Sequence, residues 1–366
     1  MKKTFRLKTP CNKSLLIGSI LFLFISGLFA QPLKVAIAGL SHDHVNGIMH
    51  QYKNGEVIIV GIAEADEQLV QRYKKTFQLP DALFFKSIGD MLKRVKPDAV
   101  LAYNAVVDHL AVVEAAAPLG LSVMVEKPLA TTVKQTERMA QLVKQYHIHL
   151  LTNYETTWYS SNQRVYEMVH TDKAIGNIRK MVVHDGHQGP IEIGCSKEFL
   201  AWLTDPVKNG GGALMDFGCY GANLMTWMMG GKAPVAVTAI DRHIKPLMYP
   251  KVDDDATILL EYPEATGIIE ASWNWPFGIK DMELFGDKGY LHSLNSNTVE
   301  RRDTNTYNKV LVPPAVYREN LSYLAAVLRK EIHPVDDLSS LENNLVVVRI
   351  LEAAKQSAAT GKRIVL

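Results

Sequence analysis

Cysteine is scarce in this chain of 366 residues: there are only three, and Cys11 lies among the first thirty residues. The other two, Cys195 and Cys219, are too few for a disulfide framework in a chain of this length. The fold must therefore be held by apolar burial, which a hydrophobic content of 47% allows. The two cysteines could pair in an oxidising compartment, but we expect two free, buried thiols.

Basic clusters and long apolar runs are also lacking beyond the first thirty residues. Those thirty hold five cations and no acid, so their removal changes the formal net charge from +2 to −3. A mildly acidic chain without a basic patch excludes a nucleic-acid partner. The basic start, the apolar run Leu15–Phe29 and the small residue Ala30 predict a signal peptide over residues 1–30 and export to the periplasm. No membrane attachment is expected after cleavage, although an uncleaved anchor is the alternative.

Strand and helix patterns alternate over residues 31–151. The buried-strand runs are Leu33–Ala38, Val57–Ala63, Ala99–Ala102, Leu121–Val125 and Ile148–Leu151. The amphipathic stretches between them include Glu67–Thr76, His109–Ala117 and Val133–Tyr146. This alternation predicts a parallel sheet of the dinucleotide-binding Rossmann type.

Residues 152–366 follow a different pattern, with strands that alternate in the antiparallel style. The runs are Ile178–His184, Val235–His243, Ala256–Tyr262, Gly267–Trp273 and Met282–Phe285, and two helices follow at Tyr317–Lys330 and Ser339–Ala359. They predict an α+β domain with an open, mainly antiparallel sheet. The expected fold class is therefore α/β, with a Rossmann domain followed by this second domain.

The turn after the first strand lacks two of the three glycines of the G-x-G-x-x-G pattern. It begins with Gly39, but Ser41 and His44 stand at the second and third glycine positions. The loop and the helix N-terminus could still hold a pyrophosphate, whereas a plain strand–helix turn is the alternative. Glu64, about twenty-five residues after Gly39, is placed to bond ribose hydroxyls and so favours NAD over NADP.

Other polar residues near the strand ends complete the predicted cofactor site. Asn104 could contact the nicotinamide ribose or simply form a turn. His42 and His44 are adjacent on one turn with no distant partner implied, so we expect Asp43 to cap the helix and expect no metal site. The predicted cofactor residues are Gly39, Ser41, His42, His44, Glu64, Asn104, His109, Glu126 and Lys127.

Lys127 follows a buried strand in the stretch Val123–Pro128, at the edge of the sheet where ligands bind. An ammonium there can bond a substrate hydroxyl. If it is desolvated, its pKa falls far enough for it to move protons at neutral pH. A solvated lysine that starts a turn is the alternative.

The glycine-rich stretch before Asp216 opens an expected helix on which Asp216, Tyr220 and Asn223 share one side. A carboxylate, a phenol and an amide there suit hydroxyl recognition and proton transfer. The alternative is an acid at a helix start and a buried tyrosine. Aromatic and amide side chains past residue 152 suit a sugar ring, and the predicted substrate contacts are Tyr154, Trp158, Asn162, His187 and Asn223.

Several motifs together resemble the Gfo/Idh/MocA family of sugar and polyol oxidoreductases. They are Glu126-Lys127-Pro128, the Gly210–Tyr220 segment, Ala271-Ser272-Trp273, Phe285–Gly289 and the closing Ala353–Gly361 helix. The likeness implies hydride transfer between a nicotinamide and a sugar carbon, with Lys127 as catalytic lysine, Asp216 as its partner and Tyr220 as acid/base. It also implies a homo-oligomer formed through the open sheet.

Most family members carry His where this chain has Tyr220. A Tyr there is similar to glucose–fructose oxidoreductase, an exported member that holds its cofactor tightly. The change moves the ordinary pKa from about 6.5 to about 10, so Tyr220 would need Lys127 as a cationic neighbour at neutral pH.

Export leaves little free nicotinamide to exchange, so we expect the protein to retain its NAD through two half-reactions. The leading hypothesis is an exported NAD(P)-dependent oxidoreductase that acts on a secondary hydroxyl of a sugar or glycoside. One alternative is a glycoside-cleaving enzyme that forms a transient keto-sugar in an NAD redox cycle. The other is a non-catalytic sugar-binding protein with a decayed cofactor site.

Overall fold

Six parallel strands form the first sheet, in the order β3-β2-β1-β4-β5-β6. They are β1 (Leu33–Ala38), β2 (Val57–Ala63), β3 (Phe84–Phe85), β4 (Ala99–Ala102), β5 (Ser122–Glu126) and β6 (Leu150–Asn153). The structure is a computed structural model that describes residues 31–366, so the predicted signal peptide lies outside the described residues. The strand order reverses between β1 and β4, which is where open α/β sheets bind their ligands.

Helices cover the first sheet, as parallel strands require. They are α1 (Val45–Lys53), α2 (Glu67–Phe77), α3 (Ile88–Leu92), α4 (His109–Ala116) and α5 (Val133–Tyr146), with short 3-10 turns at Asp81–Leu83, Val106–Asp108 and Ala117–Leu119. Local chemistry fixes their starts: Asp66 accepts the N–H groups of Gln68 and Leu69 at the start of α2. The Rossmann prediction is confirmed, and only the two-residue strand β3 was missed.

Nine strands form the second sheet, in the order β14-β13-β12-β11-β7-β10-β9-β8-β15. They are β7 (Ile178–Gly186), β8 (Ala236–Arg242), β9 (Asp255–Glu261), β10 (Thr266–Ser272), β11 (Ile279–Gly286), β12 (Tyr290–Asn295), β13 (Thr298–Arg302), β14 (Asn308–Val310) and β15 (Ile364–Val365). Only β7 and β10 pair in parallel, so the prediction of an open, mainly antiparallel sheet is confirmed.

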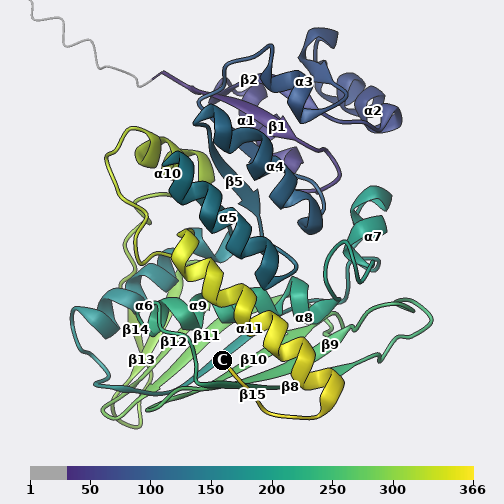
Figure 1. The fold of residues 1–366 in the computed structure, drawn as a ribbon. Helices are drawn as coiled ribbons and strands as arrows, with labels where there is room; N and C mark the ends of the chain where they lie inside the picture. The colour runs from purple at the N-terminus through teal and green to yellow at the C-terminus, as the bar shows by residue number, and fades with distance from the viewer. Residues whose placement is uncertain (1–30) are drawn as a thin grey trace, which may run out of the picture. The chain divides into compact units, whose positions relative to one another are not determined.

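One face of this second sheet is covered by helices α6 (Ser160–His170), α9 (Gly218–Met228) and α11 (Leu341–Thr360), which lie on the same side of it in Figure 1. The remaining helices are α7 (Lys197–Leu203), α8 (Ala213–Asp216) and α10 (Asn320–Leu328), with a 3-10 turn at Glu155–Trp158. Burial alternates strictly along β9, as expected of a strand with one face in the core.

The two last helices connect the sheets. Leu321, Leu324 and Val327 of α10 belong to the core that packs under the first sheet. Helix α11 packs against α5 on one side and against α9 and β8 on the other. The C-terminal segment thus helps to hold both sheets together, and the domain boundary at residue 151 stays a prediction. Within residues 31–366, no helix combines the length and the apolar character that crossing a membrane requires.

Candidate active site

The chain turns sharply where β1 ends, and this turn brings two loops together. Gly39 has a φ of +85°, and a Cβ there would lie 2.6 Å from the Cβ of Asn104. Only glycine combines this backbone conformation with so close an approach. The loops after β1 and β4 therefore lie against each other, which places the predicted cofactor residues Gly39 and Asn104 side by side.

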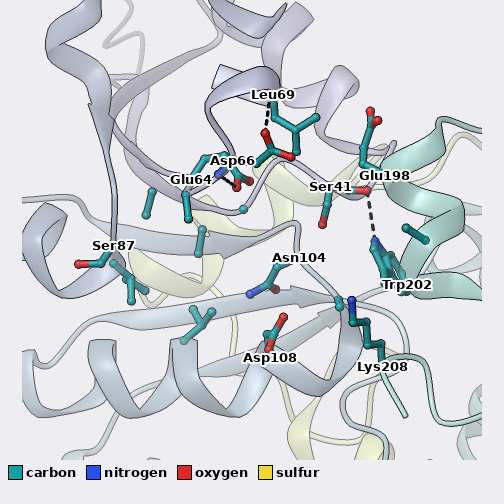
Figure 2. A pocket seen from close by; sticks show the side chains of 18 of the residues that line it. Ser41, Glu64, Asp66, Leu69, Ser87, Asn104, Asp108, Glu198, Trp202 and Lys208 are labelled. Atoms are coloured by element: carbon teal, nitrogen blue, oxygen red, sulfur yellow. Dashed lines mark hydrogen bonds between the residues drawn. The ribbon is translucent and has the colours of Figure 1, made fainter. Parts of the chain in front are cut away.

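A cavity of about 730 Å³ opens beside this turn, at the carboxyl ends of β1, β2 and β4. Ser41, Glu64 and Asn104 line it, as Figure 2 shows. The carboxylate of Glu64 accepts the backbone N–H of Leu40 at 2.8 Å and that of Asp66 at 2.9 Å. These bonds hold Glu64 at the edge of the cavity and leave lone pairs on both oxygens for a ligand.

The residues around the cavity fit NAD. Within residues 31–366, the backbone N–H groups of Ser41 and Asp43 donate no hydrogen bond, so they are available to a pyrophosphate. The buried Oδ1 of Asn104 also has no partner in that part of the chain and can accept a bond from a ribose or amide. Glu64 lines the same cavity, and its contact with ribose hydroxyls stays a prediction.

Helix α7 forms the opposite wall of the cavity and is bonded to the loop after β1. Trp202 Nε1 donates to the carbonyl of Ser41 at 3.2 Å, and the N–H of Ser196 donates to Asp43 Oδ2 at 2.9 Å. Arg72 of α2 forms an ion pair with Glu198 of α7. Asp43 was predicted to cap α1, and this is wrong: His44 is at the N-cap position with no side-chain cap bond, because Asp43 bonds α7 instead.

His42 and His44 do have a distant partner, which the sequence did not indicate. Burial opposes charge on His44, but the attraction of Glu126 outweighs it and raises the pKa of the imidazole. His44 Nδ1 donates to Glu126 Oε2 at 3.0 Å, and Asn153 donates to the other oxygen at 2.8 Å. The ligand atoms of His42, His44 and Glu126 lie within 4.8 Å of one another, which is the spacing of a possible metal site.

The hydrogen bonds of His42 argue against metal ligation. Its Nδ1 accepts the N–H of His44 at 3.2 Å, so the neutral ring carries its proton on Nε2, the atom that a metal would need. Burial lowers the pKa of His42, which keeps the ring neutral. The absence of a metal site therefore stays our prediction.

Lys127 and Asp216 form a buried ion pair between the two domains. Lys127 Nζ donates to Asp216 Oδ1 and, at 3.1 Å, to the carbonyl of Asp216. Trp273 Nε1 donates to Asp216 Oδ2 at 3.0 Å. Burial opposes charge on Lys127, but Asp216 outweighs it and raises the pKa of the ammonium; burial likewise opposes charge on Asp216, and Lys127 lowers its pKa. The expectation of a low lysine pKa is therefore wrong, because the carboxylate is in contact.

Tyr220 lies beside this pair but not on the helix of Asp216. The predicted single helix is broken at Phe217: Asp216 ends α8, and Tyr220 is in the first turn of α9. The Lys127 ammonium lies 5.1 Å from the centroid of the Tyr220 ring. Burial raises the pKa of Tyr220 well above its ordinary value, with Asp185 adding to the effect. The expectation that Lys127 would lower this pKa is wrong, and Tyr220 is a proton donor at rest.

Three residues near Tyr220 were not among the predicted site residues: Asp185, Lys280 and Glu155. Together with Lys127, Asp216 and Tyr220 they are called the cluster below. Lys280 Nζ lies 4.6 Å from the Tyr220 ring centroid and forms an ion pair with Glu155. Asp185 is directly opposite Lys280 in the pairing of β7 with β11. The sequence did carry a signal for two of them. Asp185 and Lys280 are polar residues at positions of β7 and β11 that face the core, and the other core-facing positions of these strands are apolar.

The predicted substrate residues have different environments. His187 is half-buried beside the cluster: its ring packs edge-on against Phe217 at 4.8 Å, and burial lowers its pKa although Asp216 opposes this. Trp158 donates to Asn153 at 3.1 Å and lines a separate cavity of about 510 Å³ with His44 and Glu126. These two remain candidates for substrate contact.

Other predicted site residues belong to the core, and these predictions are corrected. Asn162 donates to the carbonyl of Thr156 and accepts from Ser293, so its amide joins α6 to β12. Asn223 faces α11 and donates to the carbonyl of Leu338. Both amides are buried in bonds that hold helices in place, which leaves no room for a sugar.

Two further predicted site residues, Tyr154 and His109, also lie in the core. Tyr154 is fully buried and packs edge-on against Tyr220 at 5.5 Å, so it supports the cluster from behind. His109 is fully buried, with Nδ1 3.1 Å from the carbonyl of Leu129, and burial lowers its pKa to about 4. His109 does not line the cofactor cavity, and it acts by holding the loop after Lys127.

Comparison with known proteins agrees with this geometry. Residues 33–154 match the model of the NAD-binding Rossmann fold of the Gfo/Idh/MocA oxidoreductases, and residues 162–292 match that of the Gfo/Idh/MocA C-terminal domain. The chain is 24% identical over 207 residues to trans-1,2-dihydrobenzene-1,2-diol dehydrogenase of Xenopus tropicalis, covering 56% of this chain and 57% of the relative. It is 25% identical over 236 residues to the enzyme of that name from Oryctolagus cuniculus, covering 63% and 65%. The alignments thus span less than two thirds of these relatives.

Solved structures share the fold over nearly the whole described chain. An aldose-aldose oxidoreductase from Caulobacter crescentus, complexed with glycerol, has a TM-score of 0.76 at 22% identity, covering 92% of this chain and 100% of that one. An inositol dehydrogenase homolog from Azotobacter vinelandii, complexed with NAD+, has a TM-score of 0.77 at 17% identity, covering 92% and 98%.

Proposed function

The chain belongs to the Gfo/Idh/MocA family of NAD-binding oxidoreductases, and from that premise we propose that it oxidises a secondary hydroxyl of a sugar or glycoside with an NAD that it retains. The observation that carries the proposal is the convergence of Lys127, Asp216 and Tyr220 at the carboxyl end of β5. The relatives named above act, by their names, on a vicinal diol, and sugars present the same arrangement of hydroxyls.

The protonation states favour stabilisation of an alkoxide. Lys127 and Tyr220 both carry protons at rest, so both can bond the oxygen that becomes negative as a hydroxyl is oxidised. The hydroxyl proton passes to Lys127 as the ammonium gives one of its own to ionised Asp216. NAD, when bound, accepts the hydride.

NAD is proposed as the cofactor in preference to NADP. Glu64 and Asp66 both line the cavity at the end of β2, and their carboxylates would repel a 2′-phosphate. Of the four cations that line the cavity, Arg72 and Lys86 are paired with Glu198 and Glu67. We expect Glu64→Ser to raise the affinity for NADP relative to NAD, as measured by fluorescence titration of the stripped protein; equal affinities in the wild type would remove Glu64 as a ribose ligand.

Cofactor retention is supported by helix α7. Its residues lie against the loop after β1 through Trp202 and Ser196, and Arg72 connects it to α2. A dinucleotide in the cavity would have to break these contacts or pass between them to leave. Retention also suits the export that the first thirty residues predict, since free NAD is scarce outside the cytoplasm.

We further propose a homo-oligomer that forms through the uncovered face of the second sheet. Ile240 of β8 and Phe285 of β11 point away from the helices and are 63% and 38% exposed. Apolar side chains on an open sheet face are typical of an interface between copies. Light scattering of the purified protein should give a multiple of the mass of one chain.

The test is product analysis with a panel of aldoses and aryl glycosides. The purified protein should convert a secondary hydroxyl to a ketone, detected by mass spectrometry after reduction with borodeuteride, without needing added NAD for the first turnover. Release of the aglycone without net NADH would instead support the glycoside-cleaving alternative. Binding of sugars with no ketone and no aglycone would support the non-catalytic one.

A further inference from the structure

Asp185 occupies a position that should be apolar. It lies on β7 two residues after Val183 and four after Met181, and both of those side chains are buried in the core of the second domain. Residues at this spacing point to the same face of a strand. The chain therefore places a carboxyl in line with two core residues, under α9, the helix that carries Tyr220.

One oxygen of this carboxyl lacks a hydrogen-bond partner in the part of the chain that the structure describes. Asp185 is 1% exposed, and its Oδ1 is buried with no hydrogen-bond partner among residues 31–366. Burial raises the pKa of Asp185 to about 8, with Lys280 and Lys127 opposing the effect, so the group is neutral at physiological pH. An unsatisfied buried polar group is destabilising, and in a native protein it calls for a functional explanation.

The two lysines near Asp185 are already bonded to other carboxylates. Lys280 lies opposite Asp185 in the register of β7 and β11, but its ammonium donates its hydrogen bond to Glu155. Lys127 bonds Asp216. Other groups near Asp185 are the thiol of Cys219 and the phenols of Tyr220 and Tyr159. Tyr159 donates to Glu155 at 2.7 Å. A neutral carboxyl can both donate and accept a hydrogen bond, which matches an alcohol better than an anion or a cation.

The outer residues of the cluster, Lys280 and Glu155, reach the surface, whereas Lys127, Tyr220 and Asp185 are buried behind them. The side chain of Glu155 is 50% exposed and that of Lys280 is 22% exposed. Lys127 and Lys280 both lie over the ring of Tyr220, at 5.1 and 4.6 Å from its centroid. A ligand that approaches Lys127 from the side of Lys280 would also come close to Asp185, the cross-strand neighbour of Lys280.

We propose that Asp185 binds the substrate hydroxyl next to the one that is oxidised, so that the enzyme selects vicinal diols. The assignment rests on the proposed function, and Asp185 is a specificity residue within it. Hydroxyls on neighbouring carbons diverge from one another, so one can reach Lys127 and Tyr220 while the other reaches the opposite side of the same cluster. The substrate hydroxyl is then the hydrogen-bond partner that the Asp185 carboxyl lacks in the folded chain.

The first test compares a sugar with its deoxy derivatives. The probes are the aldohexose that the wild type oxidises fastest and each of its monodeoxy sugars. Loss of one neighbouring hydroxyl should lower kcat/KM of the wild type by about tenfold or more, the scale of one lost hydrogen bond in a buried site. Asp185→Ala should show the same loss with the intact sugar and no further loss with that deoxy sugar. If the two losses multiply, Asp185 does not bind that hydroxyl.

The second test separates binding from folding. In the absence of sugar, Asp185→Asn should unfold at the same temperature as the wild type or higher, because the amide is neutral without the proton that Asp185 must take up on folding. A fall in Tm would show a structural role and overturn the proposal. Asp281→Asn is the matched control, on the opposite face of the sheet: Asp281 accepts from His184 at 2.7 Å, so its loss should lower Tm and leave the diol preference unchanged.

Failure of the proposed function gives a different result. If the wild type oxidises none of the sugars, the proposed function is wrong and this assignment falls with it. If the wild type oxidises one of them and keeps its preference for the intact diol after Asp185→Ala, only the assignment of Asp185 is wrong.

Discussion

Lys127 shows how a single contact decides the chemistry of a residue. The sequence places a lysine at the end of a buried strand, and burial alone would lower its pKa. Asp216 is eighty-nine positions away in the sequence, yet it touches the ammonium and raises that pKa instead. The lysine is thus held in its charged form, and its proposed role as a proton relay depends on its carboxylate partner.

Lys127→Ala and Tyr220→Phe should each lower kcat by about a hundredfold or more, the usual scale for a lost acid/base group. Both groups would bond the reacting oxygen, so the loss should appear in kcat while bound NAD is unchanged. Stopped-flow reduction of the bound cofactor measures it. Tyr262→Phe, which alters a buried phenol just after β9 and outside the cluster, is the matched control and should keep full activity. Full activity of Tyr220→Phe would make that phenol structural.

Asp185 makes a separate prediction about pH. Its folded-state pKa of about 8 lies above the ordinary value of about 4, so the folded protein holds the proton more tightly than the unfolded chain. The part of the free energy of unfolding that comes from this tighter proton binding is complete below about pH 4. It falls as the pH rises from about 4 and is lost once the pH has passed about 8. The Tm gained by Asp185→Asn should therefore grow between pH 5 and pH 8 in sugar-free protein. A gain that does not change with pH would contradict the assigned pKa.

Residue-level prediction placed residues correctly where the chemistry is local, while their contact with a cofactor stays a prediction. Gly39 and Glu64 follow from their places at strand ends, and the structure places both at one cavity. Asn162 and Asn223 failed because an amide gives no sign of whether its partner is a ligand or another helix. Asp185 and Lys280 were missed because their meaning depends on which strands pair, and no local pattern specifies that pairing.

Among the elements, the broken helix at Phe217 shows what the sequence could not specify. Positions 213–228 have helical character throughout, and two helices do form there. The break occurs where the carbonyl of Asp216 accepts from Lys127 of the other domain and from the thiol of Cys219 at 3.2 Å. These bonds turn Asp216 toward Lys127, and one of them comes from a distant part of the chain. Cys219 is free and buried as expected, whereas Cys195 is free but only half-buried.

Helix α7 is the element that we expect to slow cofactor release. Glu198→Gln removes the ion pair with Arg72 and should speed NAD dissociation by about two- to fivefold, since such a partly exposed pair is worth little more. Release into excess apo-protein or a coupled NAD assay measures the rate. Glu114→Gln is the control, because it removes the pair with Arg138 on an exposed surface of the first domain. Equal rates in the wild type and Glu198→Gln would show that α7 does not hold the cofactor.

For the whole molecule, the order of patterns along the chain was enough to predict two domains and their sheet types. Alternating strands and helices gave the parallel sheet, and successive strands gave the open one. Strands β12 to β14 were not predicted, because they are short and lie toward one edge, where few apolar residues are needed. The helix Tyr317–Lys330 was expected to help close the two domains onto each other, but an apolar helix face does not identify which sheet it covers, and α10 packs into the core of the first one.

The export hypothesis makes a prediction about the mature chain. Intact mass of protein from the periplasm should correspond to a chain that begins at Gln31, because the apolar run is followed there by a small residue and a polar one. Replacing the run's centre with charged residues should keep the protein in the cytoplasm at full length. Full-length chain in the periplasmic membrane fraction would support an uncleaved anchor instead.

The central claim is that this protein is a sugar oxidoreductase with its own NAD, and one measurement tests it most directly. The protein is purified from the periplasm without added nucleotide, its nicotinamide is quantified by mass spectrometry after denaturation, and aldoses are added to the native sample under an absorbance monitor. We predict close to one NAD(H) per chain and a rise at the NADH band when the correct sugar is added, absent in Lys127→Ala. Protein that carries no nicotinamide, and that neither binds NAD nor forms NADH when both NAD and sugar are supplied, would contradict the account.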